Sequence, residues 1–188
     1  MQREFREAKK SGRELEEAIA RILVAAGWAV IPVTASSDVG IGPRVMSKDG
    51  TIVAPDLICF RKGRCRMVET KNKSTFSLHR NTGTWLTGID TKHFNDYDKV
   101  QTACGCKLCV VFLQRPEGDS PSGVYFQWVD ELKQHVHHSW DENGMTYWAE
   151  KDLSRMMDWD TWTLNNIPMD GLIGTNARLL AIKQEEQK

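Results

Sequence analysis

The sequence predicts a single α/β domain in which a central mixed sheet is flanked by helices. Three observations support this fold class. The chain has 188 residues, 40% of them hydrophobic, which suits one compact core. Apolar residues recur with helical spacing in some segments and form short β-branched runs in others. The expected elements follow as a helix, three strands, a helix and two strands, an order typical of a mixed sheet covered by helices.

The first helix is expected over residues 13–26. Leu15, Ile19 and Ile22 are separated by four and three positions, so their side chains fall on one face of a helix. Gly27 follows this apolar stripe, and glycine commonly ends helices because it adopts a left-handed backbone conformation without strain. An amphipathic helix that packs one face on the core is therefore expected at the start of the domain.

Three strands are expected next. Residues 28–33 are apolar and partly β-branched, which predicts the first of them. Residues 34–50 contain three glycines, a proline and three serines, and are expected to form a long loop or a hairpin. The other two strands are expected over residues 52–60 and 64–71, joined by a tight turn at residues 61–63.

The spacing of apolar residues predicts a second helix over residues 91–103, in which Tyr97 occupies one of the apolar positions. Residues 72–90, which precede it, are polar and irregular and are expected to form a loop. Buried strands are expected over residues 108–113 and 124–129. The segment after these strands is rich in tryptophan and has no clear periodicity.

Charge and cysteine content narrow the class of protein. The net charge is zero, but residues 61–80 hold seven basic side chains and one acidic side chain, whereas residues 130–160 hold eight acidic and three basic ones. This segregation fits a nucleic-acid-binding face, and two ordinary solvated faces would show the same pattern. Five cysteines and a charged N-terminal segment predict a cytoplasmic, intracellular protein. No apolar run approaches the roughly 18 residues of a membrane span, so no membrane partner is expected.

Two carboxylates and a lysine are expected on one face of the paired strands. Glu69 and Lys71 are two residues apart in a strand, so their side chains share a face, and Asp56 lies on the adjoining strand across the hairpin. Carboxylate oxygens suit Mg²⁺, and a nearby ammonium group can orient water at a phosphate. The alternative interpretation is an ordinary surface ion pair. Pro55 and Asp56 argue against it, because both residue types are rare inside strands and suggest a bulge beside a site.

Glu16 is a third candidate acid. It shares a side of the first helix with Ile19 and Leu23, so its carboxylate is expected near the core. A carboxylate at such a position loses hydration unless it is paired or bound to a metal. It could equally lie at the rim of the apolar stripe.

Taken together, these residues resemble the PD-(D/E)xK nuclease superfamily, whose shared core is the restriction-endonuclease-like α/β/α fold, and in particular the archaeal Holliday-junction resolvases. The resemblance covers residues 11–113. The positions that carry it are Gly12, Glu16, Gly27, Trp28, Ser36, Ser37, Asp56, Leu57, Ile58, Glu69, Thr70 and Lys71. Two features depart from the resolvases: the loop over residues 37–51 is longer, and the tryptophan-rich segment after residue 129 has no counterpart. Viral nucleases of the superfamily share the same core, so a viral member is also considered.

The resemblance implies a role for each matched residue. Asp56 and Glu69 would bind Mg²⁺, for which Mn²⁺ could substitute, through their side chains. Thr70 would add its backbone carbonyl, Lys71 would be the catalytic lysine, and Glu16 would be the acid contributed by the helix. Contacts to DNA are expected from residues that flank the site or match the family's positions: Ser36, Ser37, Lys73, Arg80, Lys92, His93 and Gln101.

The resulting functional hypothesis is a metal-dependent DNA endonuclease of recombination and repair that selects branched DNA and works as a homodimer. The resemblance implies products with a 5′-phosphate and a 3′-hydroxyl. The alternatives are an exonuclease that processes DNA ends, in a trimeric or larger ring, and a nucleic-acid-binding module that does not cut. Residues 1–130 are expected to form the nuclease core, and residues 131–188 an extension packed on the same domain.

Overall fold

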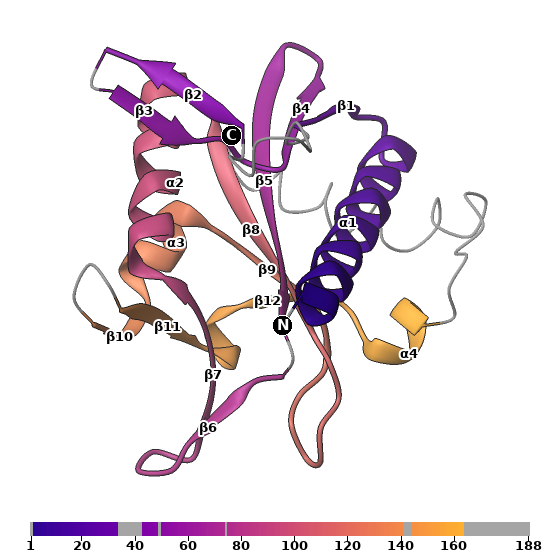
Figure 1. Cartoon of the computed structure of the whole chain (residues 1–188), viewed down its shortest axis with the longest axis vertical. Coiled ribbons are helices and arrows are strands. Elements are labelled where there is room, and N and C mark those ends of the chain that lie inside the picture. Colours follow the sequence, from indigo (N-terminus) through magenta and orange to yellow (C-terminus); the bar gives the residue numbers. More distant parts are fainter. Residues whose placement is uncertain (1, 34–42, 49, 74, 141–143, 164–188) are drawn as a thin grey trace.

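The computed structural model describes residues 2–33, 43–48, 50–73, 75–140 and 144–163, with side chains from residue 12 onwards. It confirms the mixed α/β fold with a central sheet flanked by helices. Helix α1 covers one face of this sheet, and α2 and α3 lie on the other (Figure 1). The bounds of the helices are α1 Gln2–Ala25, α2 Thr91–Cys104, α3 Val129–Gln134 and α4 Trp159–Thr163, with a 3₁₀ turn η1 at Glu150–Asp152.

The central sheet has six strands in the order β1-β4-β5-β8-β9-β12. Strands β5 and β8 run parallel, and the other neighbouring pairs are antiparallel. A parallel pair requires a crossover connection, and α2 lies within the connection between β5 and β8. The bounds of these strands are β1 Ala29–Pro32, β4 Leu57–Arg61, β5 Arg64–Lys73, β8 Lys107–Gln114, β9 Gly123–Trp128 and β12 Ser154–Met157.

A second sheet of four strands has the order β10-β11-β7-β6, and β2 and β3 form a separate ribbon. The loop expected over residues 72–90 is therefore wrong, because this segment contains β6 and β7. Strand β7 pairs with the short strand β6 just before it and with β11, which follows it by about 60 residues. The bounds are β2 Arg44–Ser47, β3 Gly50–Val53, β6 Ser77–His79, β7 Thr84–Asp90, β10 Val136–Ser139 and β11 Met145–Ala149.

The end of α1 is set by Gly27, as its sequence predicts. Gly27 has a φ of 84°, its N–H donates to the carbonyl of Val24 at 2.9 Å, and the N–H of Trp28 donates to the carbonyl of Leu23 at 3.0 Å. These two bonds form a Schellman motif, which satisfies carbonyls that the helix leaves unpaired. Trp28 then packs in the core under the helix and leads the chain into β1.

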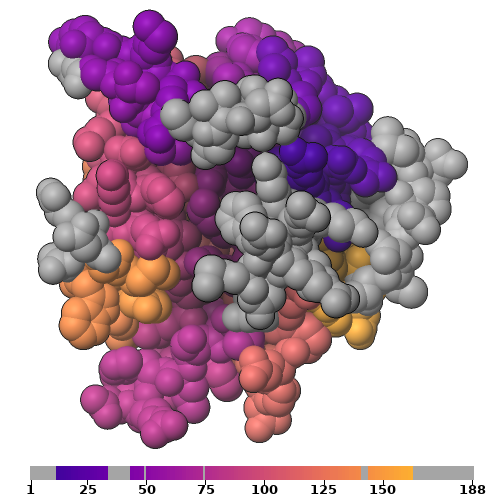
Figure 2. Space-filling view, in the orientation of Figure 1, coloured from indigo at the N-terminus to yellow at the C-terminus, as the bar shows by residue number. Residues whose placement is uncertain are grey.

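The strand expected over residues 52–60 is divided in two. Strand β3 ends at Val53, residues 54–56 lie outside any strand, and β4 begins at Leu57. Pro55 has no N–H to offer to a ladder, so pairing cannot continue through it. Strand β3 belongs to the ribbon with β2, which packs beside α2 (Figure 2), whereas β4 belongs to the central sheet. Asp56 therefore lies at the corner where the chain passes between the two.

One hydrophobic core lies on each face of the central sheet. The α1-side core includes Leu15, Ile19 and Val68, and the α2-side core includes Met67 and Trp148. Successive residues of β5 thus alternate between the cores, as strand geometry requires. Among the described residues, no helix is long and apolar enough to cross a membrane.

The start of α2 is held by the hairpin of β10 and β11. The N–H of Thr91 donates to the carbonyl of Gly144 at 3.0 Å, and the hydroxyls of Thr91 and Thr146 are 2.9 Å apart. Farther along, the indole N–H of Trp148 donates to the carbonyl of Leu132 in α3 at 2.7 Å. Residues 136–149 therefore fix the position of α2 against the sheet.

Replacing Gly88 with alanine should destabilise the fold. An added Cβ at Gly88 of β7 would lie 2.7 Å from the backbone oxygen of Thr146 on β11. We expect Gly88→Ala to lower the free energy of unfolding in urea by about 1–3 kcal/mol, because such overpacking forces the strands apart. The control is Gly12→Ala in α1, where nothing lies within 4 Å and helix propensity favours alanine by about 1 kcal/mol. A Gly88→Ala protein as stable as wild type would contradict the close pairing of β7 and β11.

Candidate active site

Glu69 and Lys71 form a buried ion pair on the α2 side of β5. The Nζ of Lys71 lies 2.6 Å from Oε1 of Glu69. Glu69 is 5% exposed, although an ordinary ion pair on a strand keeps both groups in water. The alternative interpretation of a surface pair is therefore wrong, because the carboxylate lies in the interior of the protein.

Tyr97 is a third member of this cluster. Its hydroxyl donates to Oε1 of Glu69 at 2.7 Å, and the Nζ of Lys71 lies 5.5 Å from the centre of its ring. Burial and the charge of Glu69 raise the pKa of Tyr97, so the hydroxyl keeps its proton and remains a donor. Sequence reasoning placed Tyr97 only among the apolar positions of the helix. The available signal was the residue type, because a buried tyrosine needs a partner for its hydroxyl.

Asp56, just before the adjacent strand β4, is held by Thr70. Oδ2 of Asp56 accepts the backbone N–H of Thr70 at 2.7 Å and its hydroxyl at 2.8 Å. The expectation that Asp56 lies within a strand is wrong, since it lies just before β4. That corner nevertheless brings its carboxylate to the middle of β5, beside Glu69, and the charge of Asp56 contributes to the raised pKa of Glu69.

Glu16 lies within electrostatic range of the same groups. Partial burial raises the pKa of Glu16, the charge of Asp56 raises it further, and Arg13 and Lys71 oppose the change. In the part of the chain that the structure describes, however, no three His, Cys, Asp or Glu side chains are arranged to hold a metal ion. Glu16 is thus close to the pair of Asp56 and Glu69 without joining it, and its catalytic and metal-binding roles stay predictions.

The pair of carboxylates fits a hard divalent cation. Oε1 of Glu69 is occupied by Lys71 and Tyr97, whereas Oε2 is buried and has no hydrogen-bond partner among the described residues. A buried carboxylate oxygen without a partner is costly, and a cation is a natural ligand for it. With Asp56 and the backbone carbonyl of Thr70, the donor set consists of oxygens, which suits Mg²⁺ or Mn²⁺.

Lys73 lies at the end of β5 next to the cluster. Burial lowers its pKa, the charge of Lys71 lowers it further, and Asp90 at the end of β7 opposes the change. Lys92 and His93 follow in the first turn of α2, where Nδ1 of His93 lies 3.4 Å from Oδ2 of Asp90. The structure therefore gathers these three predicted DNA contacts around the ends of β5 and β7.

The remaining predicted DNA contacts are not gathered at the site. Arg80 is exposed in the turn between β6 and β7. The opposite end of β7 carries Asp90, and the length of the strand separates the two by roughly 20 Å. Ser36 and Ser37 lie outside the described residues.

Gln101 links three elements of the fold. Its Nε2 donates to Oδ1 of Asp130 at 2.6 Å, and its Oε1 accepts the N–H of Leu108 at 2.8 Å. Both ends of the amide are thus used between α2, α3 and β8, and a contact of Gln101 with DNA stays a prediction. Tyr97, one helical turn earlier, is the residue of α2 that reaches Glu69.

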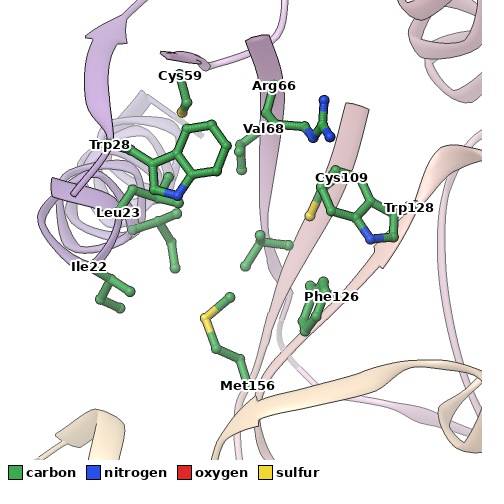
Figure 3. A pocket seen from close by; sticks show the side chains of 12 residues that line it. Ile22, Leu23, Trp28, Cys59, Arg66, Val68, Cys109, Phe126, Trp128 and Met156 are labelled. Atoms are coloured by element: carbon green, nitrogen blue, oxygen red, sulfur yellow. The ribbon is translucent and has the colours of Figure 1, made fainter. Parts of the chain in front are cut away.

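A pocket on the opposite face of the sheet is not part of this site. It lies between α1 and the central sheet, and its lining is mostly apolar, with Trp28, Val68 and Phe126 among the side chains (Figure 3). Arg66 is its charged member, and its guanidinium carbon lies 5.9 Å from the ring centre of Trp128. None of the predicted site residues is among the described residues that line it.

The free energy of unfolding should fall as the pH rises through the titration of Glu69. Burial raises the pKa of Glu69 from 4.5 to about 7, with the charge of Asp56 adding to the rise and Lys71 and Tyr97 opposing it. Between these values the folded protein holds a proton that the unfolded chain has released, so raising the pH favours unfolding. In EDTA, the contribution lost between about pH 4.5 and pH 7 should be of the order of 3 kcal/mol.

Glu69→Gln should remove this part of the pH dependence, since glutamine does not titrate. Urea unfolding at pH 5 and pH 8 would measure it, and Glu117→Gln, at an exposed residue of the loop between β8 and β9, is the control. An unchanged difference between the two pH values in Glu69→Gln would show that Glu69 titrates near its ordinary value.

Comparisons with known proteins give a distant likeness among solved structures. No protein-family model matches the sequence, and no curated protein matches it. Among solved structures, the fold is similar to that of Hjc from Archaeoglobus fulgidus, a Holliday junction resolvase from an archaeal hyperthermophile. The two chains are 12% identical with a TM-score of 0.49, over 75% of this chain and 85% of the other. These comparisons assign the chain to no family.

Proposed function

We propose that this chain is a metal-dependent nuclease that hydrolyses phosphodiester bonds of DNA. One observation carries the proposal. The buried carboxylate of Glu69 has one oxygen occupied by Lys71 and Tyr97 and the other without a partner, and it lies beside Asp56. Burying a carboxylate in this way is unfavourable for stability alone. It is favourable for holding a cation next to a lysine, which is the combination that phosphodiester hydrolysis needs.

Asp56, Glu69 and the backbone carbonyl of Thr70 would hold a divalent metal. When bound, Mg²⁺ or Mn²⁺ would neutralise negative charge on the phosphate undergoing attack. Glu16 would act from the side of α1, where its carboxylate senses the charges of Asp56 and Lys71.

Lys71 would provide the positive charge that orients water at the site. Its ammonium group is held by Glu69 and lies against the ring of Tyr97, so it is directed toward the carboxylates. From there it would orient a water molecule for attack on phosphorus. As the new P–O bond forms, the bond from phosphorus to the 3′-oxygen breaks. That oxygen takes up a proton, which leaves a 3′-hydroxyl and a 5′-phosphate.

Lys73, Lys92 and His93 would bind phosphates next to the cleaved bond. They surround the ends of β5 and β7 beside the carboxylates, and Lys92 is exposed. Phosphate contacts of this kind give affinity that does not depend on sequence and decreases with salt. Ser36, Ser37, Arg80 and Gln101 stay candidates for contacts farther from the cleaved bond.

We further propose that the enzyme is an endonuclease selective for branched DNA, in recombination or repair. The support is the resemblance of Glu16, Asp56, Glu69 and Lys71 to the positions of archaeal Holliday-junction resolvases. The viral source considered from the sequence has no support from the comparisons and is not proposed.

The nuclease core and the C-terminal extension are proposed to form one folding unit. Strand β12 of the extension pairs with β9 in the central sheet, and β11 pairs with β7. Through Thr91, the extension also holds the start of α2, which carries Tyr97.

Cleavage should require a divalent metal and Lys71. We expect wild type to cut labelled DNA in Mg²⁺ or Mn²⁺ but not in EDTA, and Lys71→Ala to lower the rate by at least about 100-fold, because its water-orienting charge is lost. Asp56→Asn and Glu69→Gln should abolish metal-dependent cutting. The control is Lys151→Ala, at an exposed residue of η1.

The same assay separates the alternatives. Cutting of four-way junctions in preference to single strands, duplexes and flaps supports the branched-DNA endonuclease. Cutting that proceeds from duplex ends would assign an exonuclease instead. Tight DNA binding by wild type with no cutting in either metal would assign a binding module.

A junction-cutting enzyme should also be a two-fold dimer, since two symmetric cuts need two sites. Light scattering should then give a mass twice the 21.4 kDa of the chain, both with and without a four-way junction. Each junction should receive paired nicks in opposing strands. A trimer with single-ended products would contradict the resolvase arrangement and favour the ring-forming exonuclease.

A further inference from the structure

We propose that Tyr97 and Thr70 are positioning residues that divide the oxygens of the two carboxylates between the protein and the metal. The inference rests on the proposed function, because it concerns the metal that the nuclease would use. It assigns a role to two uncharged hydroxyl groups. The hydroxyl of Thr70 belongs to β5, which also carries Glu69, whereas the hydroxyl of Tyr97 comes from α2.

Tyr97 controls which oxygen of Glu69 remains available. Its hydroxyl donates to Oε1, the same oxygen that Lys71 contacts, while Oε2 has no partner among the described residues. The ammonium of Lys71 has three N–H donors, and in the proposed reaction it would share them between this oxygen and the attacking water. Tyr97 is 1% exposed and packs in the α2-side core, so its hydroxyl is held rigidly. It keeps Oε1 occupied when Lys71 moves.

Thr70 has the corresponding role at Asp56. Its backbone N–H and its hydroxyl both donate to Oδ2, so two bonds converge on one oxygen and fix the plane of the carboxylate. Asp56 lies at the corner before β4, where its backbone carbonyl accepts the N–H of Val33 at 2.7 Å, a bond that does not orient its side chain. The hydroxyl of Thr70 therefore supplies orientation that the backbone at Asp56 does not. The two hydroxyls act on different carboxylates and come from different elements, β5 and α2.

Groups that orient metal ligands by hydrogen bonds commonly change metal affinity or activity by about 10–100-fold when they are removed. Tyr97→Phe keeps the ring under Lys71 and removes the hydroxyl. Thr70→Val keeps the β-branched shape and the backbone N–H. Both variants should therefore fold, with melting temperatures in EDTA close to that of wild type.

The test is the affinity of the DNA-free protein for Mn²⁺, measured by titration calorimetry. We expect Tyr97→Phe and Thr70→Val each to weaken it by about 10–100-fold, and the double variant to weaken it more than either single variant, because each hydroxyl orients a different carboxylate. In cleavage assays, the Mn²⁺ concentration for half-maximal rate should rise similarly, and the rate at saturating Mn²⁺ should fall less. A residue with a merely structural role would not shift the metal dependence.

Matched controls remove a hydroxyl elsewhere. Tyr147→Phe alters a ring of β11 stacked on His138 with centres 4.6 Å apart, and Thr102→Val alters an exposed hydroxyl that bonds the Asp98 carbonyl within α2. Both should bind Mn²⁺ as wild type does. If Tyr97→Phe melts much earlier than wild type, Tyr97→Trp, which restores a ring and an N–H donor, should recover part of the Mn²⁺ affinity.

The outcomes distinguish this inference from the proposed function. Wild type that binds Mn²⁺ and loses it in Asp56→Asn, combined with unchanged affinity in Tyr97→Phe and Thr70→Val, overturns the positioning role and leaves the nuclease intact. Wild type that neither binds Mn²⁺ nor cuts DNA overturns the proposed function and this inference together. Weakened Mn²⁺ binding in both variants and in neither control supports the inference.

Discussion

The carboxylate of Glu69, held almost completely out of water, is the constraint on which the rest of the structure depends. Removing an ionised carboxylate from water costs several kcal/mol even after the protein relaxes. One ammonium and one hydroxyl offset part of this cost at a single oxygen, and the other oxygen has no partner among the described residues. The fold thus keeps in its interior a carboxylate with one oxygen that no described residue pairs. Selection for stability alone would not keep such a group. In the proposed function, metal binding would give that group a use.

The central position of β5 makes this arrangement possible. It lies between β4 and β8 in the sheet. Strand β8 pairs with it over residues 66–73, whereas β4 pairs with it only as far as Val68, so the N–H of Thr70 donates to the carboxylate of Asp56 instead of to a strand. Its alternation sends Met67, Glu69 and Lys71 toward α2, and Val68 and Thr70 the other way. The corner before β4 then returns Asp56 to the backbone of β5. The three charged side chains therefore lie close enough to interact with one another.

The sequence predicts the α/β class, α1 with its end at Gly27, and the elements that carry Glu69 and Lys71, because each depends on local periodicity or spacing. It does not reveal that Thr84–Asp90 is a strand, since its local partner β6 has only three residues and its other partner β11 is about 60 residues away. It also extends one strand through Pro55, where the chain in fact passes from one ribbon to another sheet.

Within the site, the sequence points to the charged residues but not to what orients them. Tyr97 is indistinguishable from a core aromatic residue until its hydroxyl is seen beside Glu69. Gln101, one turn later, is polar and was therefore the natural candidate to face the site. Its amide instead joins α2 to Asp130 and Leu108, a choice fixed by the rotation of the helix against β8. Helix rotation is a tertiary property, and a short polar helix does not encode it locally.

The hydrogen bonds of Thr91 have a consequence for the order in which the protein is made. Asp56, Glu69 and Lys71, which surround the proposed metal site, leave the ribosome before α2 does, since all three precede Thr91 in the sequence. The helix that carries Tyr97 is anchored at its start by Gly144 and Thr146, which emerge about 50 residues later. During synthesis, the charged groups therefore exist for a time without the helix that encloses them. A nascent chain of this protein would acquire its enclosed carboxylate only after residues 144–146 have emerged.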